Sequence, residues 1–124
     1  MLGDMIEPET PEPKLFTYLC YLCIKIPVMF AVHSVYRKPI EEVDQYLPAH
    51  RAFLQNLYKK GVTICSGPQV PRNGGFILMR AASKTEAMEI MKNDPYVING
   101  VAEYSVIEFE VRSFAEGFEK FLAE

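Results

Sequence analysis

Residues 47–54 read Leu-Pro-Ala-His-Arg-Ala-Phe-Leu, and this stretch decides how the rest of the chain can fold. Around it, aliphatic residues recur at the three- and four-residue spacing of one helix face. The stripe that they form with the histidine consists of Val43, Leu47, His50, Leu54 and Leu57. Because an amphipathic helix turns its apolar stripe inward, we expect the imidazole of His50 to point toward the core or a cleft.

The position of His50 on an apolar stripe has two interpretations. Histidine has an unperturbed pKa of about 6.5, close to working pH, which suits it to moving protons. The other interpretation is a buried histidine that makes one hydrogen bond and has no chemical role. The spacing alone favours this second interpretation.

The segments beside this helix predict a strand before it and an interruption within it. Residues 30–36 are rich in β-branched and aromatic side chains, which is typical of a strand. The helix itself is expected over residues 41–60, with Gly61 as its stop. Since a proline inside a helix disrupts its hydrogen bonds, Pro48 predicts either a bend near Leu47 or a short helix followed by the main one.

The next part of the chain predicts a pair of strands and a second helix. Residues 62–66 and 76–81 are expected to be strands, and the loop between them is rich in glycine and proline. Ser83 and Glu86 have the spacing of a capping box, in which each side chain accepts from a backbone N–H of the first turn. A helix is therefore expected over residues 83–93.

The C-terminal part predicts a fourth strand and a last short helix. Residues 103–111 have the composition of a strand. Ser113 and Glu116 form a second capping box, which predicts a helix, although Gly117 weakens it. The apolar stripe of this helix consists of Phe114, Phe118 and Phe121.

The predicted order of elements is β-α-β-β-α-β, the split ferredoxin-like arrangement of the α+β class, with a helix appended. Both main helices would pack on one face of a four-stranded antiparallel sheet, and the other face of a monomer should be polar. Instead, two of the predicted strands are apolar in both phases. Their apolar residues include Phe30, Ala31, Val32 and Val35 in the first strand, and Phe76, Ile77, Leu78 and Met79 in the third.

A sheet that is apolar on both faces requires a second cover. A second copy of the chain is the simplest cover, so we predict a homodimer with the open faces of the two sheets together. The competing cover is the apolar run of residues 15–24, folded over its own sheet.

Length and composition indicate one domain with a real core. The chain has 124 residues, of which 49% are hydrophobic, and its net charge is −3 without a basic block. Phosphate binding needs clustered lysine and arginine, so nucleic acid is excluded as an expected partner. Three cysteines, an odd number, fit a reducing compartment better than a disulfide framework, and we expect a cytoplasmic protein.

We interpret residues 1–28 as an extension of a domain over residues 29–124. Residues 1–14 are acidic and proline-rich, which predicts a disordered tail. The apolar run that follows is shorter than the ~20 residues that cross a bilayer, so membrane insertion is not expected, although a role at a membrane surface is a weaker alternative. It also lacks the features of a signal peptide. Met29 is an alternative natural start.

The same apolar run contains Cys20 and Cys23, which have the spacing of half a zinc or redox site. No second pair accompanies them in the sequence, so we interpret the spacing as a coincidence and expect no metal.

Residues 29–112 resemble the YCII-related family of small proteins, in the dimeric α/β-barrel superfamily. No single matching piece is specific, but all of them occur in order and at family-like spacing. The pieces are residues 47–54, Cys65-Ser66-Gly67-Pro68, Pro71-Arg72-Asn73-Gly74-Gly75, Asp94-Pro95-Tyr96 with Gly100, Ala102-Glu103-Tyr104 and Ile107-Glu108-Phe109. Residues 1–28 and the phenylalanine-rich C-terminus have no counterpart.

The resemblance implies a ferredoxin-like fold, a dimer, and a pocket that contains a histidine and an aspartate. Those family positions fall on His50 and Asp94, and the serine of the family's Ser-Gly-Pro motif falls on Ser66. The resemblance also implies a small-molecule ligand, because enzymes of the superfamily act on small cyclic, often aromatic-derived, substrates.

A contact between Asp94 and His50 would create an acid/base catalyst. A carboxylate that accepts from one ring nitrogen fixes the tautomer and raises the basicity of the other. Isomerisation, elimination and proton abstraction beside a carbonyl need only such a proton transfer, so we expect no cofactor. Asp94 also precedes Pro95, which suits a helix N-cap, and it can have both roles.

Three further residues are candidates for substrate binding. Ser66 can donate to a substrate oxygen or shape the turn before Gly67. Arg72 can bind a substrate carboxylate, although a solvated loop arginine is the simpler interpretation. Tyr96 can close the pocket as an aromatic wall or merely pack.

Two functions follow from this sequence. The first is a small cytoplasmic enzyme, a metal-independent lyase or isomerase, that uses His50 and Asp94 on a small cyclic or unsaturated carbonyl compound. The alternative is a non-catalytic dimeric module that binds a small ligand or a protein, in which the two residues form a structural hydrogen bond.

Overall fold

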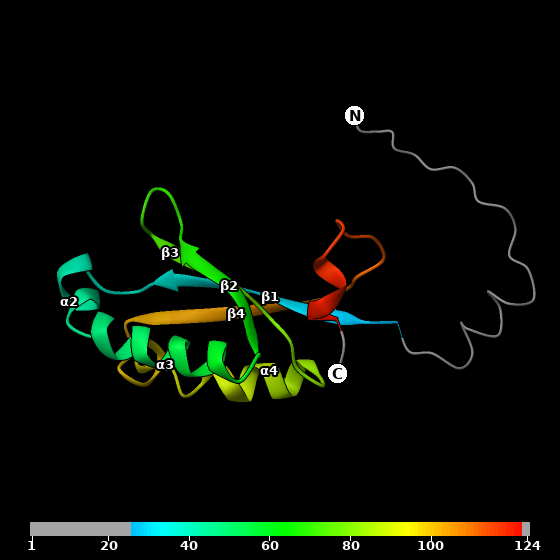
Figure 1. Cartoon of the computed structure of the whole chain (residues 1–124). Coiled ribbons are helices and arrows are strands. Elements are labelled where there is room, and N and C mark those ends of the chain that lie inside the picture. Colours follow the sequence, from blue (N-terminus) through cyan, green and yellow to red (C-terminus); the bar gives the residue numbers. More distant parts are fainter. Residues whose placement is uncertain (1–25, 123–124) are drawn as a thin grey trace, which may run out of the picture.

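The computed structural model describes residues 26–122, in which a four-stranded antiparallel sheet carries its helices on one face (Figure 1). The strand order is β2-β3-β1-β4. This is the predicted ferredoxin-like α+β fold, which is therefore confirmed. In chain order the elements are β1 (Val28–Tyr36), α2 (Ile40–Asp44), α3 (Leu47–Lys59), β2 (Thr63–Pro68), β3 (Gly74–Met79), α4 (Lys84–Met91), α5 (Pro95–Ile98), β4 (Ala102–Glu110) and η1 (Phe118–Phe121).

Several predictions for the N-terminus fall on residues that the structure does not describe. The tail over residues 1–14, the apolar run over residues 15–24, and the pair formed by Cys20 and Cys23 lie outside the described part. Within residues 26–122, no helix combines the length and the apolar character needed to cross a bilayer.

The predicted first helix is divided into α2 and α3, and Pro48 explains the division. The helix α3 begins at Leu47, so that Pro48 falls in its first turn, where a missing N–H breaks no helical hydrogen bond. The backbone N–H of His50 then donates to the carbonyl of Tyr46 at 2.9 Å. Of the two expected outcomes, the short helix followed by the main one is confirmed, and His50 lies within the first turns of α3.

The main core lies between the sheet and the helices α3 and α4. Alternate residues of β1, including Phe30 and Val32, are fully buried against it. Its buried members are Phe30, Val32, Leu54, Leu57, Ile77, Met79, Ala87, Met91 and Val106. The stripe around His50 therefore points inward as expected, because Leu54 and Leu57 join this core.

A second, smaller core closes one end of the sheet. It consists of Val43, Tyr96, Val101 and Ala102, from α2, α5, β4 and the turn that precedes β4. The first capping box fixes the start of α4, because the Ser83 hydroxyl accepts from the backbone N–H of Glu86 at 3.0 Å. The capping prediction for this helix is confirmed.

Two glycines that were predicted to lie in the hairpin loop instead begin β3. Gly74 and Gly75 pair with Val35 and Ser34 of β1. A Cβ atom on Gly74 would lie 1.9 Å from the backbone oxygen of Ser34, so only glycine allows the two strands to approach this closely.

The predicted C-terminal helix is wrong. Residues 113–117 are not helical, and only the 3₁₀ turn η1 forms. Gly117 has φ 93°, in the left-handed region, so a right-handed helix cannot run through it. Ser113 accordingly does not cap a helix, although Phe114, Phe118 and Phe121 do cluster with ring centroids 5.4–6.1 Å apart.

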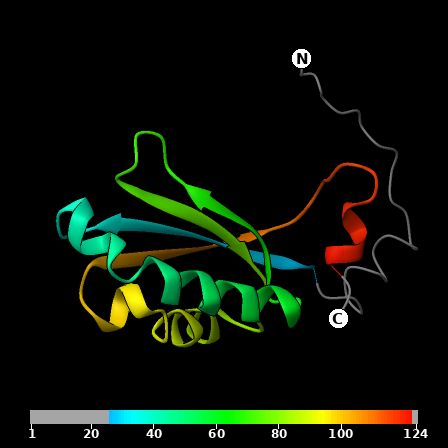
Figure 2. The same ribbon diagram turned by 60° about the vertical axis from the view of Figure 1, so that its left-hand side comes forward.

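The C-terminal segment crosses to the face of the sheet opposite the helices (Figures 1 and 2). Together with this face it forms a small open hollow of about 250 Å³, lined from the sheet by Met29, Leu78 and Phe109 and from the segment by Phe114 and Phe118. The segment therefore covers one end of the open face. Outside the covered end, Phe76 and Ile107 remain 52% and 59% exposed.

Candidate functional site

A pocket of about 710 Å³ lies between α3 and the strands β1, β2, β3 and β4. The helix α3 contributes one of its faces, on which the lining residues recur at the three- and four-residue spacing of a helix. This face consists of Leu47, His50, Arg51, Leu54, Gln55 and Tyr58. A pocket of this volume accommodates a small organic molecule.

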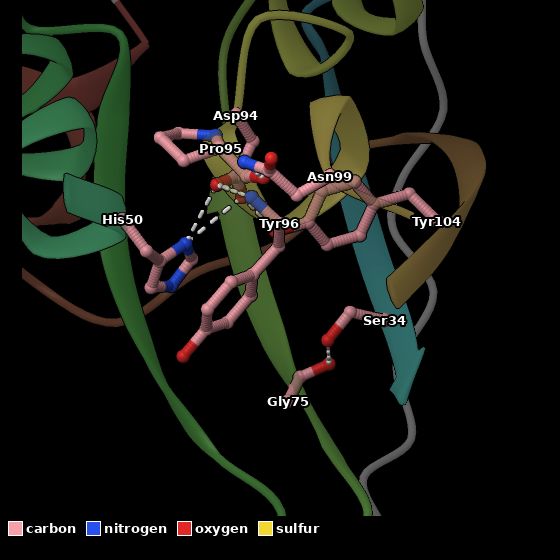
Figure 3. A network of polar contacts seen from close by, with 8 residues as sticks. All are labelled: Ser34, His50, Gly75, Asp94, Pro95, Tyr96, Asn99 and Tyr104. Atoms are coloured by element: carbon pink, nitrogen blue, oxygen red, sulfur yellow. Dashed lines mark hydrogen bonds and ion pairs between the residues drawn. The ribbon is translucent and has the colours of Figure 1, made fainter. Parts of the chain in front are cut away.

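His50 lines this pocket, and Asp94 contacts it from behind, outside the pocket lining (Figure 3). The Nδ1 atom of His50 lies 2.8 Å from Oδ1 and 2.9 Å from Oδ2 of Asp94. The histidine side chain is 14% exposed and the aspartate side chain is fully buried. Since a carboxylate can only accept, Nδ1 is the donor, and Nε2 of the neutral ring is left as the basic nitrogen.

Asp94 also begins the short helix α5, so it is both a helix cap and the partner of His50. Its Oδ1 atom accepts from the backbone N–H of Tyr96 at 3.0 Å, and Pro95 occupies the first helical position. Proline fits there because its missing N–H would have no partner in the helix. The cap fixes the carboxylate before any ligand arrives.

A third donor to Asp94 comes from Tyr104 of β4, whose hydroxyl donates to Oδ2. Burial raises the pKa of this tyrosine well above its usual range, and the charge of Asp94 raises it further. Tyr104 therefore remains a protonated donor. The sequence pointed to Tyr104 only as part of the family resemblance, and its role at the carboxylate was missed.

Tyr96 stacks on His50 with parallel rings, at a centroid distance of 3.9 Å and an interplanar angle of 5°. Its hydroxyl is buried, and among residues 26–122 it has no hydrogen-bond partner. Burial raises the pKa of Tyr96 to about 12, even though the charge of nearby Arg72 lowers it. The ring lines the pocket and also packs face to face on the imidazole, which restricts the orientation of His50.

Arg72 lines the same pocket and is held in place by two neighbours. Its Nη2 atom donates to Asp44 at 2.7 Å, and its guanidinium carbon lies 5.5 Å from the ring centre of Tyr36. The hydrogen bond to Asp44 raises the pKa of Arg72. Arg72 is thus an ion-paired loop arginine whose side chain is 34% exposed, and the binding of a substrate carboxylate by it stays a prediction.

Ser66 lies farther along the pocket, where β2 faces α3. Its hydroxyl is 2.5 Å from that of Tyr58, which sequence analysis did not single out. The two hydroxyls form a polar pair among the lining residues.

His33 lies on the open face of the sheet, away from this network. It stacks on Phe76 at 4.5 Å and its Nε2 atom is 3.1 Å from Oε1 of Gln69. Within the described residues, histidine, cysteine, aspartate and glutamate side chains do not gather in groups of three or more that could hold a metal ion.

The comparisons with known proteins agree with this architecture. The model of the YCII-related domain matches residues 28–110, so the chain belongs to the YCII-related family. No curated protein matches the chain. Among solved structures, the chain is similar to 5-chloro-2-hydroxyhydroquinone dehydrochlorinase from Burkholderia phenoliruptrix AC1100 in complex with 2,5-dihydroxybenzoquinone, with a TM-score of 0.54 and 23% identity over 73% of this chain and 97% of that one. This likeness establishes the shared fold.

Proposed function

We propose that the protein is a small-molecule enzyme in which His50 moves a proton through Nε2 while Asp94 orients the ring. The observation that carries the proposal is the contact of His50 with a fully buried carboxylate at the wall of a pocket of about 710 Å³. A base of this kind, fixed in one tautomer and facing a hollow, is suited to general acid/base catalysis.

The reaction that fits best is an elimination or isomerisation of a small cyclic or unsaturated carbonyl compound. An isomerisation removes one proton from carbon and returns one at another carbon, whereas an elimination removes one proton and expels a leaving group with its electron pair. The name of the structurally similar dehydrochlorinase describes an elimination on a ring compound, which supports this class. The stacked rings of His50 and Tyr96 give the pocket a flat aromatic edge that suits a planar ligand.

The test is a turnover assay that follows carbon–hydrogen exchange and product formation in D₂O by NMR. The panel contains small cyclic enones, unsaturated lactones and chlorinated hydroquinones. We expect His50→Ala to lose about 100- to 10,000-fold in rate, the usual contribution of general acid/base catalysis. The matched control is His33→Ala, which removes the other histidine from the open face and should keep the rate.

The alternative is a non-catalytic module that binds a small ligand or a protein partner. It is favoured by one observation, that Asp94 accepts from three donors and caps α5, which is a structural role. In that case His50→Ala and Asp94→Asn lower the melting temperature, and neither the wild type nor the variants turn over any compound of the panel. Full turnover in His50→Ala would rule out the catalytic role of this histidine.

We also propose that the chain forms a homodimer through the open face of its sheet, in a reducing compartment such as the cytoplasm. The exposed side chains of Phe76 and Ile107 on this face support the first statement. The free, exposed thiol of Cys65 supports the second.

A further inference from the structure

The hydroxyl group of Tyr96 is a buried polar group without a protein partner at the edge of the pocket. It makes no hydrogen bond of normal geometry to any residue in the described part of the chain, although Arg72 lies close enough to interact with it, and the whole residue is only 2% exposed. Buried polar groups in native proteins are nearly always paired. A hydroxyl that borders a hollow and lacks a partner indicates that its partner enters the hollow from outside, as water or as a ligand.

The charges around this hydroxyl favour an anion. The pocket lining contains two arginines, Arg51 and Arg72, and no aspartate or glutamate among the described residues. Arg72 lies close enough to Tyr96 to lower its pKa. Asp44 offsets part of this charge, but it occupies one of the five N–H donors of the guanidinium, so other donors remain for a ligand.

The hydroxyl of Tyr96 also has a fixed position relative to His50, the proposed base. Because the rings of Tyr96 and His50 lie parallel at 3.9 Å, the direction of one determines that of the other. Figure 3 shows the second ring nitrogen of His50 and the hydroxyl of Tyr96 both on the side of the site that points away from Asp94. A small ligand beside Nε2 therefore reaches this hydroxyl once it displaces the side chains that cover the oxygen in this structure.

We propose that Tyr96 and Arg72 bind the anionic oxygen of a planar ring compound, an enolate or phenolate oxygen, and that Tyr96 is a catalytic residue. The catalytic part rests on the proposed function of His50. When Nε2 of His50 takes a proton from a ring carbon, the electron pair of that C–H bond moves into the ring and places the negative charge on the carbonyl oxygen. The hydroxyl of Tyr96 then donates to this oxygen, and Arg72 stabilises its charge.

The protonation state of Tyr96 suits this role. Its pKa of about 12 keeps the hydroxyl protonated at neutral pH, so that it can donate a hydrogen bond to an anionic ligand instead of repelling it as a phenolate. Because the hydroxyl itself is buried, a hydrogen bond from it to an oxyanion is screened little by solvent.

The binding of 4-nitrophenol tests the oxyanion site without any turnover. Its ionised form absorbs at longer wavelength than its neutral form, so a titration shows which form is bound. We expect the wild-type protein to prefer the ionised form and to shift the ionisation midpoint of the bound probe to lower pH. Tyr96→Phe and Arg72→Gln should each weaken binding of the ionised form by about tenfold, the effect of one charge-assisted hydrogen bond.

The matched control is Tyr46→Phe, which removes a hydroxyl beside the same small core but outside the pocket lining, and which should bind the probe like the wild type. The proposal is overturned if the wild type fails to bind the ionised probe, or binds both forms equally, or if Tyr96→Phe keeps wild-type affinity. A weakened Tyr96→Phe combined with full turnover in His50→Ala would leave the oxyanion site standing and remove the proposed base.

The stability of Tyr96→Phe distinguishes a binding role from a structural one. Because the hydroxyl has no partner in the described residues, its removal should leave the melting temperature unchanged or raise it. A lower melting temperature would show that the hydroxyl supports the fold and would overturn the proposal.

Discussion

At the level of single side chains, Asp94 organises the site by accepting from three elements at once. It takes a ring N–H from α3, a backbone N–H from α5 and a hydroxyl from β4. Each of these bonds satisfies part of the charge that burial would otherwise make costly. The carboxylate is therefore fixed whether or not a ligand is bound, and the orientation of His50 is fixed with it.

Alkaline pH should destabilise the fold through Tyr96. Its pKa is about 12 in the folded protein against about 10 in an unfolded chain, so the folded state keeps a proton that the unfolded chain releases. The contribution of Tyr96 to the free energy of unfolding is fully present below pH 10 and is lost as the pH rises through 12. We expect the melting temperature of Tyr96→Phe to fall less between pH 9 and pH 11.5 than that of the wild type.

The comparison with Tyr46→Phe controls for the loss of any one tyrosine near this core. That variant should keep the wild-type decrease of melting temperature over the same range. Equal decreases in the wild type and in Tyr96→Phe would contradict the raised pKa.

The sequence predicted some site residues well and missed others for a physical reason. The helical stripe placed His50 at the pocket, and the family resemblance paired it with Asp94. Tyr104 follows the alternation of a strand, so its pattern shows only that it faces the helices. That its hydroxyl reaches Asp94 depends on how β4 and α5 pack, which no local pattern determines.

At the level of strands and helices, the backbones of β1 and β3 approach each other closely at Gly74. A Cβ atom on Gly74 would lie 1.9 Å from the Ser34 oxygen, which is backbone and cannot move aside. We expect Gly74→Ala to lower the free energy of unfolding by about 1–3 kcal/mol or more, as over-packing does. Thermal or urea unfolding measures this change.

The matched control is Gly67→Ala in β2, where an added Cβ would meet nothing within 4 Å. This variant should stay within about 0.5 kcal/mol of the wild type. A neutral Gly74→Ala, or equal losses in both variants, would show that the strands do not approach as closely as described.

The boundaries of the elements show where local patterns suffice. Pro48 predicted either a bent helix or two separate helices. The packing of Val43 into the second core selects the second arrangement, with α2 as a short separate helix. In the C-terminal segment, the capping pattern of Ser113 was outweighed by Gly117 and by the apolar contacts of the phenylalanines with the sheet. A local capping pattern is weak and does not start a helix ahead of a residue held in the left-handed region.

At the level of the whole chain, the two faces of the sheet have separate tasks. His50, Asp94 and Tyr104 lie on the face that the helices cover, together with the pocket. On the opposite face, Ala31, Leu78 and Ile107 lie side by side across β1, β3 and β4. A dimer formed through this second face would leave the pocket accessible in each subunit.

We expect Ile107→Glu to convert the proposed dimer into a monomer. Ile107 is 59% exposed at the middle of the open face, so a dimer would bury a charge at this position without a partner. Sedimentation equilibrium or light scattering should give twice the chain mass for the wild type and a single chain mass for the variant.

The matched control is Ile98→Glu. Ile98 is similarly exposed, at 66%, but lies on α5 away from the sheet face, so this variant should leave the mass unchanged. A monomeric wild type would contradict the dimer, and the C-terminal segment would then be the cover that this face has in the single chain.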